Sequence, residues 1–436
     1  MAAPEDTRAS SRISGFYKMS PAQRLAELER RGVLHADDVA LLTERSGGLP
    51  LETANQMIEN MIGVLELPLG LGLNFMINQR DYMVPMAIEE PSVMAAVSHI
   101  AKLTRKSGGF EASCDSNVMI GQVQVIGVKD MDAARVAVLE RRGELLELAN
   151  ALHPKMQARG GGAKGIEVRV LDGGEYSRML VVHLLIDCRD AMGANLINTM
   201  AEGIAPRVEE LTGGKVFLRI LSNLADRRLA RASCRIPFEH LAWKDFSGED
   251  VARGIALASE FAEADPYRAT THNKGVMNGI SAVCIASGND WRAIEAGAHA
   301  YCCRDGRYRP MATWHIEEDA YLVGQLELPI QVGTVGGPIK LHPTVQLVHK
   351  ILDISSAREL AMVMASVGLA QNMGALKALA TVGIQQGHMA LHARAVAATA
   401  GARPSELDQI VRQLIDEDNV KVHRARQLLE QLRRER

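Results

Sequence analysis

The 436-residue chain has little excess charge, no long hydrophobic run and no CxxC cysteine pair. A net charge of −3 and a pI near 6.5 give no basic surface to favour nucleic acid, and none of the nucleic acid binding signatures occurs. The longest apolar stretches, such as residues 65–73, are interrupted by proline and glycine and fall short of the roughly 20 residues that a membrane span requires. The N-terminus lacks the basic and apolar segments of a secretory signal. These absences predict a cytoplasmic protein.

The cysteines are scattered, with neither a CxxC pair nor the cysteine and histidine spacing of a metal site. Each is expected to be a buried thiol, so the sequence predicts no bound metal and no disulfide framework. Apolar residues make up 47% of the chain and charged residues 23%, which is the balance of an ordinary globular protein. At this length we expect two or more domains.

Residues 117–222 are expected to fold as one unit with the element order β-α-β-β-α-β. Strands are predicted at 118–128, 166–170, 179–186 and 215–221, and helices at 132–151 and 191–211. This is the order of a ferredoxin-like fold, in which two helices cover one face of a sheet. It is not the βαβαβ order of a Rossmann half.

Elements of a larger α/β unit are expected on both sides of that segment. Helices are predicted at 51–62, 93–104 and 251–262 and, as one or two buried helices, at 356–382, with strands at 82–88 and 320–326. Ser20 before Pro21 is typical of a helix N-cap followed by proline at the first helical position. The stretch 66–72, broken by glycine and proline, is predicted to be a loop without a dinucleotide fingerprint.

Lys274 and Asp290 stand sixteen residues apart, among small, polar and glycine residues rather than on a charged helical face. A lysine beside a carboxylate in a desolvated pocket can bond a carbonyl oxygen and stabilise the negative charge that develops on it. On spacing alone, a loop lysine in an ordinary ion pair is the alternative.

Two further stretches carry candidate acids. Glu89 and Glu90 lie between an apolar strand and a helix, where adjacent side chains point to opposite sides, so at most one can face a given pocket. A pair of acids that complements the helix dipole is the alternative. After Asp190, small residues suit the approach of an anion such as pyrophosphate to a helix N-terminus, although Asp190 as a plain N-cap is equally compatible.

His388 and His392 lie one turn apart on a predicted helix near the C-terminus. Histidine has the ordinary side-chain pKa nearest neutrality, so either residue can deliver a proton, although a lone helical histidine is more often structural. Gly383 and Gly387 would suit a hinge for a moving C-terminal segment.

Short motifs follow one another along nearly the whole chain. They are Glu59-Asn60-Met61-Ile62-Gly63, Glu89-Glu90-Pro91-Ser92, Asp190-Ala191-Met192-Gly193-Ala194-Asn195, Thr271-His272-Asn273-Lys274-Gly275, Gly288-Asn289-Asp290-Trp291-Arg292, Gly333-Thr334-Val335-Gly336-Gly337 and Gly387-His388-Met389. In this order, over roughly residues 15–430, they resemble the motif series of 3-hydroxy-3-methylglutaryl-coenzyme A (HMG-CoA) reductase. The membrane-free chain resembles the bacterial class II branch of that family.

The resemblance implies an α+β fold, with a large mixed α/β domain, an inserted ferredoxin-like cofactor-binding domain and a mobile helical C-terminal segment. The implied limits are 1–116 and 223–382 for the large domain, 117–222 for the small nicotinamide-cofactor-binding domain and 383–436 for a C-terminal flap. Homodimers or assemblies of dimers with shared active sites are also implied.

The implied reaction interconverts HMG-CoA and (R)-mevalonate plus CoA by two hydride transfers. NAD(H) is the first choice of cofactor, NADP(H) stays open, and mevalonate degradation is the expected direction. Lys274 would stabilise the negative oxygen left by hydride transfer, and Asp290 would keep Lys274 charged and couple it to Glu90. Glu90 would supply a proton when the aldehyde is reduced, and His388 would protonate the departing CoA thiolate.

Binding residues also follow from the resemblance. Ser92, Arg268 and Thr271 would surround the HMG carboxylate, Asn278 and Asn223 would lie near the active centre, and Asp190, Met192, Gly193 and Asn195 would lie along the cofactor. His153 stands where an NAD-specific family member carries an aspartate for the adenine ribose. A carboxylate there would repel a 2′-phosphate, whereas His153 with Lys155 would not. Tyr17 stands where a relative has an arginine for a CoA phosphate, which weakens the expectation of that contact.

Three rival functions stay open at this point. One is an NADP-dependent biosynthetic reductase of the same family. Another is a non-catalytic CoA-binding protein that has kept the fold. The third is a different CoA-linked oxidoreductase that acts on another short acyl-CoA.

Overall fold

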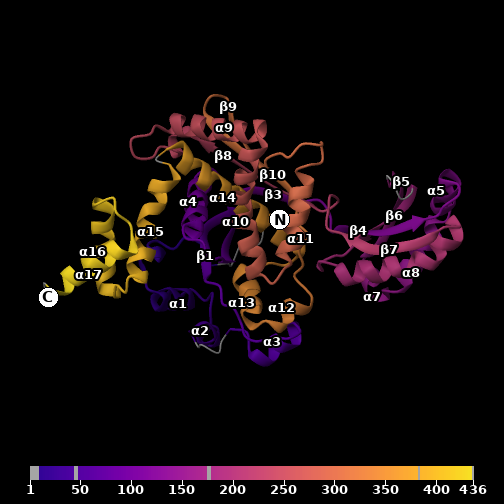
Figure 1. The fold of residues 1–436 in the computed structure, drawn as a ribbon, viewed down its shortest axis with the longest axis horizontal. Helices are drawn as coiled ribbons and strands as arrows, with labels where there is room; N and C mark the ends of the chain where they lie inside the picture. Colours follow the sequence, from indigo (N-terminus) through magenta and orange to yellow (C-terminus); the bar gives the residue numbers. More distant parts are fainter. Residues whose placement is uncertain (1–8, 44–47, 174–177, 382, 435–436) are drawn as a thin grey trace, which may run out of the picture.

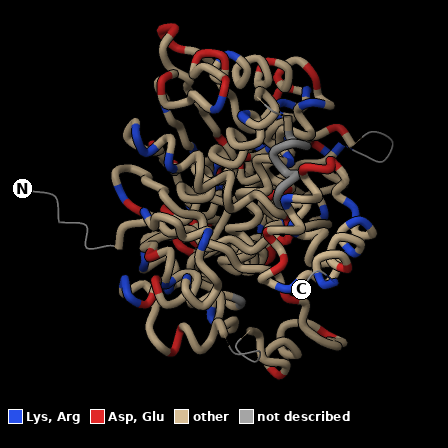
Figure 2. The backbone as a smooth tube through the Cα atoms, turned by 90° about the vertical axis from the view of Figure 1, so that its left-hand side faces the viewer, with Lys and Arg blue, Asp and Glu red and all other residues tan. Residues whose placement is uncertain are grey.

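The computed structural model describes residues 9–43, 48–173, 178–381 and 383–434, and the side chains of residues 338 and 384–391 fall outside its description. Figure 1 shows a central body between two smaller parts. A small sheet with its own helices lies at one end of the body, and a group of C-terminal helices lies at the opposite end. Basic and acidic residues are interspersed along the backbone, as Figure 2 shows. In the described part of the chain, no helix is both long enough and apolar enough to cross a membrane.

The central body is built on an antiparallel sheet of order β3-β8-β10-β9 and on the hairpin β1-β2. Its strands are β1 (Leu69–Ile77), β2 (Arg80–Ala87), β3 (Glu111–Cys114), β8 (Leu229–Pro237), β9 (Ala312–Glu317) and β10 (Tyr321–Pro329). The helices packed here include α4 (Val93–Arg105), α9 (Gly248–Ala264), α10 (Pro266–Ala286) and α14 (Ala357–Ala380). Helix α14 is buried along most of its length, so it forms the centre of the core.

Close packing of α10 against α14 depends on glycine. A Cβ added at Gly279 would lie 2.9 Å from the carbonyl oxygen of Val367. A Cβ at Gly368 would meet the side chain of Ile280 at 2.8 Å. The two helices therefore approach each other more closely than bulkier residues would permit.

The remaining elements of the central body are short. They are η1 (Phe16–Lys18), α1 (Pro21–Arg30), α2 (Ala36–Thr43), α3 (Leu51–Met57), η2 (Phe238–His240), α11 (Trp291–Tyr301), α12 (Gly337–Leu341) and α13 (Pro343–Leu352). Ser20 caps α1 and Pro21 occupies its first position, which confirms the predicted helix start.

The small sheet has the order β5-β6-β4-β7, with every neighbouring pair antiparallel. Its elements in chain order are β4 (Val118–Ile126), α5 (Met131–Glu140), α6 (Arg142–Ala151), α7 (Pro154–Ala158), β5 (Gly162–Asp172), β6 (Arg178–Asp187), α8 (Ala194–Thr212) and β7 (Lys215–Ser222). The order and pairing are those of a ferredoxin-like fold, so that prediction is confirmed. The helix predicted over 132–151 is two helices, because the chain leaves helical geometry at Arg141.

The C-terminal helices α15 (Ile384–Thr399), α16 (Pro404–Asp416) and α17 (Val422–Arg434) pack on one another around a core of their own. Arg433 on α17 donates to the buried carboxylate of Glu406 on α16, at 2.8 Å. The separate core fits a C-terminal unit that folds around itself, whereas its motion as a flap stays a prediction, as do the domain limits.

Two local predictions were wrong. The stretch 66–72 is only partly a loop, because β1 begins at Leu69 and pairs with β2 through Gly70 and Gly72. The helix predicted over 51–62 ends at Met57, and the chain then runs without helix or strand to β1. In the stretch 66–72 the glycines and Pro68 suggested a turn, but pairing with β2 gives the backbone from Leu69 its hydrogen bonds.

Candidate active site

Helix α10 places four of the predicted site residues on one face. Arg268, Thr271, Lys274 and Asn278 are spaced three, three and four residues apart, so they lie within one side of the helix. The opposite side is buried in the central core. The stretch 271–279 is therefore helical throughout, and the alternative of a loop lysine is excluded.

Lys274 is paired with Glu90, which follows the end of β2. The Lys274 Nζ lies 2.6 Å from Glu90 Oε2, and Asn278 Nδ2 donates to the same oxygen at 3.2 Å. The neighbouring Glu89 is exposed and makes no hydrogen bond or ion pair with Lys274 or Asn278. One acid of the two thus faces the candidate site, as the sequence predicts.

The pair is open to solvent in the single chain. The Lys274 side chain is 62% exposed and that of Glu90 is 33% exposed. An ammonium group can donate three hydrogen bonds, and Glu90 takes one of them in the described residues. The expected desolvated pocket is therefore incomplete in an isolated subunit.

Ser92 lies two residues after Glu90 and caps α4 with an unusual backbone. Its φ of 77° falls in the left-handed region, which L-residues other than asparagine and aspartate seldom adopt. Its carbonyl oxygen accepts from Ala96 N at 2.8 Å, which begins the helix. Strain of this kind concentrates at functional sites, so it supports placing Ser92 in the site.

Arg268 and Thr271 lie on α10 towards its N-terminus from Lys274. The guanidinium of Arg268 is half-buried, and burial lowers its pKa from the usual value. Among the described residues, this guanidinium has no hydrogen-bond or ion-pair partner, while Thr271 is exposed beside it. A half-buried arginine without an anion is suited to bind a carboxylate from outside the chain.

Asp290 does not reach Lys274 within the chain. It caps α11 by accepting from Ala293 N at 3.1 Å, and Arg292 lies 3.7 Å from its carboxylate. The preceding residue, Asn289, donates its backbone N–H to the carbonyl of Cys284. Cys284 is ten residues beyond Lys274 on α10, or about 15 Å along the axis, and no hydrogen bond or ion pair joins Asp290 to Lys274 in the described residues.

Residues 190–193, which the resemblance places along the cofactor and which we call the cofactor loop, pack against the central body. The carbonyl of Asp190 accepts from Thr334 N at 2.8 Å, and its carboxylate accepts from Ala357 N, at the start of α14, at 2.9 Å. Helix α8 is capped by Gly193 and not by Asp190, so the plain N-cap interpretation is wrong. Asp190 instead joins the small sheet to the turn after β10 and to the central helix.

Gly193 suits a ligand-binding helix start. Its φ is 103°, and an added Cβ would meet the Cys188 sulfur at 2.3 Å, so no other residue fits. No side chain caps the first turn of α8, whose N–H groups are thus available to an anion. Asn195 is exposed in that turn, and the backbone N of Met192 lies against Gly333.

Asn223 and His153 lie apart from this loop in the chain. Asn223 follows β7, is exposed, and accepts from Gln331 Nε2 through its backbone carbonyl at 3.0 Å. His153 precedes α7, and its Nε2 is buried without a hydrogen-bond partner in the described residues. An orphaned buried nitrogen is compatible with a missing ligand partner.

The predicted proton donor His388 has its side chain outside the described residues. Its backbone belongs to α15, which begins after Gly383, a residue with a φ of 81°. His392, one turn later, is exposed. The proton-donor role of either histidine stays a prediction.

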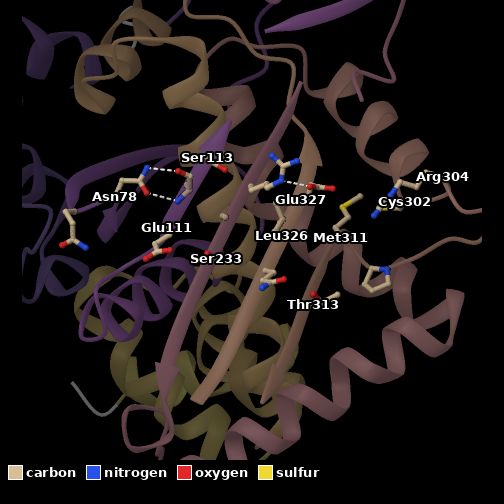
Figure 3. Close-up of a pocket in the computed structure, with 16 residues that line it drawn as sticks. Asn78, Glu111, Ser113, Ser233, Cys302, Arg304, Met311, Thr313, Leu326 and Glu327 are labelled. Atoms are coloured by element: carbon tan, nitrogen blue, oxygen red, sulfur yellow. Dashed lines mark hydrogen bonds and ion pairs between the residues drawn. The ribbon is translucent and has the colours of Figure 1, made fainter. Parts of the chain in front are cut away.

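A hollow of about 950 Å³ opens on the central sheet, and Figure 3 shows its lining. The residues that line the hollow include Asn78, Glu111, Arg231, Arg304 and Glu327, and none of the predicted site residues is among them. Arg231 there already bonds Glu327 at 2.6 Å. The candidate site is therefore formed by Glu90, the side chains on one face of α10 and the cofactor loop.

Sequence reasoning missed Arg228, a buried residue beside the cofactor loop. It donates to the carbonyls of Ala191 and Val332. In the sequence it is one of two adjacent arginines, and nothing there distinguishes it from the exposed Arg227. The one available signal is its place as the last residue of a short polar connection, directly before an apolar strand.

Comparison with known proteins finds likeness over nearly the whole chain. The family described as hydroxymethylglutaryl-coenzyme A reductase matches residues 20–393. The 3-hydroxy-3-methylglutaryl-coenzyme A reductase of Archaeoglobus fulgidus is 49% identical over 424 residues, which are 97% of this chain and 95% of the relative.

Solved structures agree. The reductase of Streptococcus pneumoniae has a TM-score of 0.82 and 45% identity, with coverage of 96% of this chain and 99% of that one. A class II structure from the same species, described as bound to NADPH in open conformations, has a TM-score of 0.82 and 46% identity, covering 84% of this chain and 99% of that chain.

The fold and these likenesses define the protein as an NAD(P)-dependent oxidoreductase. More specifically, the chain belongs to the hydroxymethylglutaryl-coenzyme A reductase family, and its fold matches that of the class II enzyme. The resemblance drawn from the seven motifs is confirmed. The non-catalytic rival and the different CoA-linked oxidoreductase are thereby disfavoured.

Proposed function

We propose that the chain interconverts HMG-CoA and mevalonate plus CoA by two hydride transfers, with Lys274 and Glu90 at the reacting carbon. The observation that carries this is the 2.6 Å contact between Lys274 Nζ and Glu90 Oε2. A bound nicotinamide cofactor supplies the hydride. Hydride transfer to a carbonyl leaves a negative oxygen, and a fixed ammonium group with free donors stabilises it.

Glu90 is the proton donor for the aldehyde step in this proposal. Lys274 and Asn278 both donate to Glu90 Oε2, so the carboxyl group is fixed beside the ammonium group. Its second oxygen is free of those two bonds. A carboxyl group that holds its proton at that oxygen can pass it to the alkoxide while Lys274 steadies the charge.

The HMG carboxylate is bound by Arg268, with Ser92 and Thr271 around it. Arg268 is a half-buried cation with no anion partner in the described residues. Lys274 lies six residues beyond Arg268 on the same face of α10, about 9 Å along the axis. That separation suits a short acyl group with its carboxylate at Arg268 and its thioester at Lys274.

The site is completed by a second copy of the chain, in a homodimer or an assembly of dimers. Between α3 and β1 the chain exposes a run of large apolar side chains, namely Ile58, Ile62, Val64, Leu65 and Leu67. A contiguous exposed apolar stretch of this kind is typical of a protein interface. Because Asp290 is out of reach of Lys274 within one chain, we infer that the partner subunit's Asp290 meets the pair.

The dinucleotide is held along α8 and the cofactor loop. The uncapped first turn of α8 and the close packing at Gly193 support an anion such as pyrophosphate there, with Asp190, Met192, Asn195 and Asn223 alongside. We propose NAD(H) as the cofactor and mevalonate oxidation as the cellular direction. The cytoplasmic location stays a prediction from the sequence.

An NADP(H)-dependent biosynthetic reductase is the second candidate. One observation favours it, since the structure has His153, and no carboxylate, at the position predicted to face the adenine ribose. A similar Streptococcus pneumoniae chain is described as bound to NADPH. The two candidates share the whole site and differ only at that end of the cofactor.

Comparison of kcat/KM for NADH and NADPH, in both reaction directions, separates the two candidates. Under the proposal the wild type prefers NAD(H), and His153→Asp raises the NADH to NADPH ratio a further tenfold or more, because a carboxylate repels a 2′-phosphate. Lys129→Ala, which changes an exposed lysine before α5 with no role in this account, is the control and should shift the ratio by less than threefold. Preference for NADPH in the wild type would support the second candidate, and inactivity with HMG-CoA and both cofactors would refute the function.

His388→Gln is expected to separate the two reductive steps. If His388 protonates the departing CoA thiolate, the variant should lose about a hundredfold in kcat with HMG-CoA and keep mevaldehyde reduction within about threefold. Absorbance of the reduced cofactor with each substrate measures both rates. Equal loss in the two assays would contradict the thiolate role. His392→Gln, one turn away, should leave both rates unchanged.

A further inference from the structure

Arg228 occupies the junction between the small sheet and the central body. It immediately precedes β8, where the chain returns from β7 to the central sheet (Figure 1). Its side chain is wholly buried. The backbone of Arg228 is fixed as well, because its N–H donates to the carbonyl of Ala225 and its carbonyl accepts from Ile330 N.

The guanidinium of Arg228 joins two segments that lie far apart in the sequence. Nη1 donates to the carbonyl of Ala191, in the cofactor loop, at 3.2 Å. Nη2 donates to the carbonyl of Val332, in the turn after β10. One side chain thus bonds the backbone on both sides of the contact between the small sheet and the central body.

The same turn is fixed to the loop that carries Asp290. Asn289 accepts from Gly333 N at 2.7 Å and donates to Gly333 O at 3.1 Å. An added Cβ at Gly333 would lie 2.6 Å from the backbone N of Met192. Contacts of Asn289 and Gly333 therefore connect Asp290 to the cofactor loop. Arg228 bonds both ends of this connection, at Val332 before Gly333 and at Ala191 before Met192.

The positive charge of Arg228 is opposed by nearby carboxylates that do not bond its guanidinium. In the described residues no carboxylate bonds its guanidinium directly, and its Nε has no partner. Burial lowers the pKa of Arg228, while the charges of Asp187 and Asp190 oppose that shift. Both acids flank the cofactor loop, so the buried cation attracts that loop as well as bonding it.

We propose that Arg228 is a positioning residue, which sets the distance between the cofactor loop at 190–193 and the loop that carries Asp290. This rests on the proposed function, because it takes the cofactor loop to be where the dinucleotide binds. Arg228 touches neither substrate nor cofactor in this account. Its loss should displace Met192 and Gly193 and weaken dinucleotide binding, while the HMG-CoA residues on α10 keep their geometry.

The test compares Arg228→Lys with Arg227→Lys, which changes the adjacent exposed arginine bonded to Glu167. Arg228→Lys keeps the buried charge but cannot bond both carbonyls in the same fork. We expect it to raise the NADH Kd, measured by fluorescence titration, and the NADH KM about tenfold. The KM for HMG-CoA should stay within twofold, and Arg227→Lys should change neither.

Arg228→Met, which removes the charge, should weaken NADH binding further still. If it does not fold, the lysine variant alone decides, with thermal unfolding showing that it is native. An unchanged NADH Kd in Arg228→Lys would overturn the proposal, as would equal rises in the KM for NADH and for HMG-CoA. A wild type that binds NADH but does not reduce HMG-CoA would refute the proposed function and leave the positioning of the cofactor loop standing.

Discussion

Replacing Lys274 by alanine is expected to lower kcat about a thousandfold or more for both HMG-CoA and mevaldehyde. Loss of one donor to a developing oxyanion typically costs 10²- to 10³-fold, and Lys274 also carries the positive charge. Both hydride transfers generate a negative oxygen at the same carbon, so both should fail together. Separate assays with the thioester and with the aldehyde measure the two losses.

The structure of the variant should be unaffected. Lys274 is largely exposed on α10, and alanine favours helix. Its melting temperature should therefore stay within about two degrees of the wild type. Lys102→Ala changes an exposed lysine on α4 that lies outside the site, and it should keep full activity. More than a tenth of wild-type turnover in Lys274→Ala would exclude Lys274 as the oxyanion partner.

Asp290→Asn is expected to lower kcat by about a hundredfold or more, although Asp290 is out of reach of Lys274 in its own chain. Asparagine caps helices as well as aspartate does, so α11 should keep its bond to Ala293 N and lose only the charge. A carboxylate from the partner that holds Lys274 charged and oriented would then be missing. Steady-state kinetics with HMG-CoA measure the loss.

Asp130→Asn is the matched control for that experiment. Asp130 caps α5 in the same way, by accepting from Ala133 N at 2.9 Å, and it lies outside the proposed site. It should leave both turnover and melting temperature unchanged. A similar loss of activity in both variants would point to helix capping, and full activity in Asp290→Asn would remove Asp290 from the mechanism.

The small ferredoxin-like unit could be predicted from the sequence because its strands and helices each have a clear period. Alternation along 166–170 and the long apolar stripe of 191–211 identify the elements, and their order determines the topology. One boundary was missed. The break at Arg141 has no proline or strong cap to mark it, so two helices appeared as one.

The central body was harder to predict because its contacts are non-local. Glycine and polar residues in 271–279 looked unlike a helix, yet Gly279 is there to let α10 approach α14, and the polar residues form the face that carries the site. The pairing of β1 with β2 likewise overrides the glycines of β1. Local propensity carries no information on the helix that packs against α10 or on the strand that pairs with β1.

The motif series predicted the candidate site residue by residue and implied sites shared between subunits, but it did not say which residues meet within one chain. Glu90 and Lys274 are 184 positions apart and meet at 2.6 Å, as the resemblance implies. Lys274 and Asp290 are near in sequence, but the rise of α10 separates them. No hydrogen bond or ion pair joins Lys274 to Asp290 in the described residues, and Arg228 emerged only from its burial between two loops.

The central claim is that each active centre combines Glu90 and Lys274 of one subunit with the partner subunit's Asp290. Its most direct test mixes the inactive variants Lys274→Ala and Asp290→Asn, after joint unfolding and refolding at equal amounts. Half of the resulting dimers should contain one chain of each kind, and in each of these one of the two sites is intact. Activity should therefore return to about a quarter of the wild-type level. If each site lies within one chain, the mixture will stay as inactive as its two components, and that result would contradict the account.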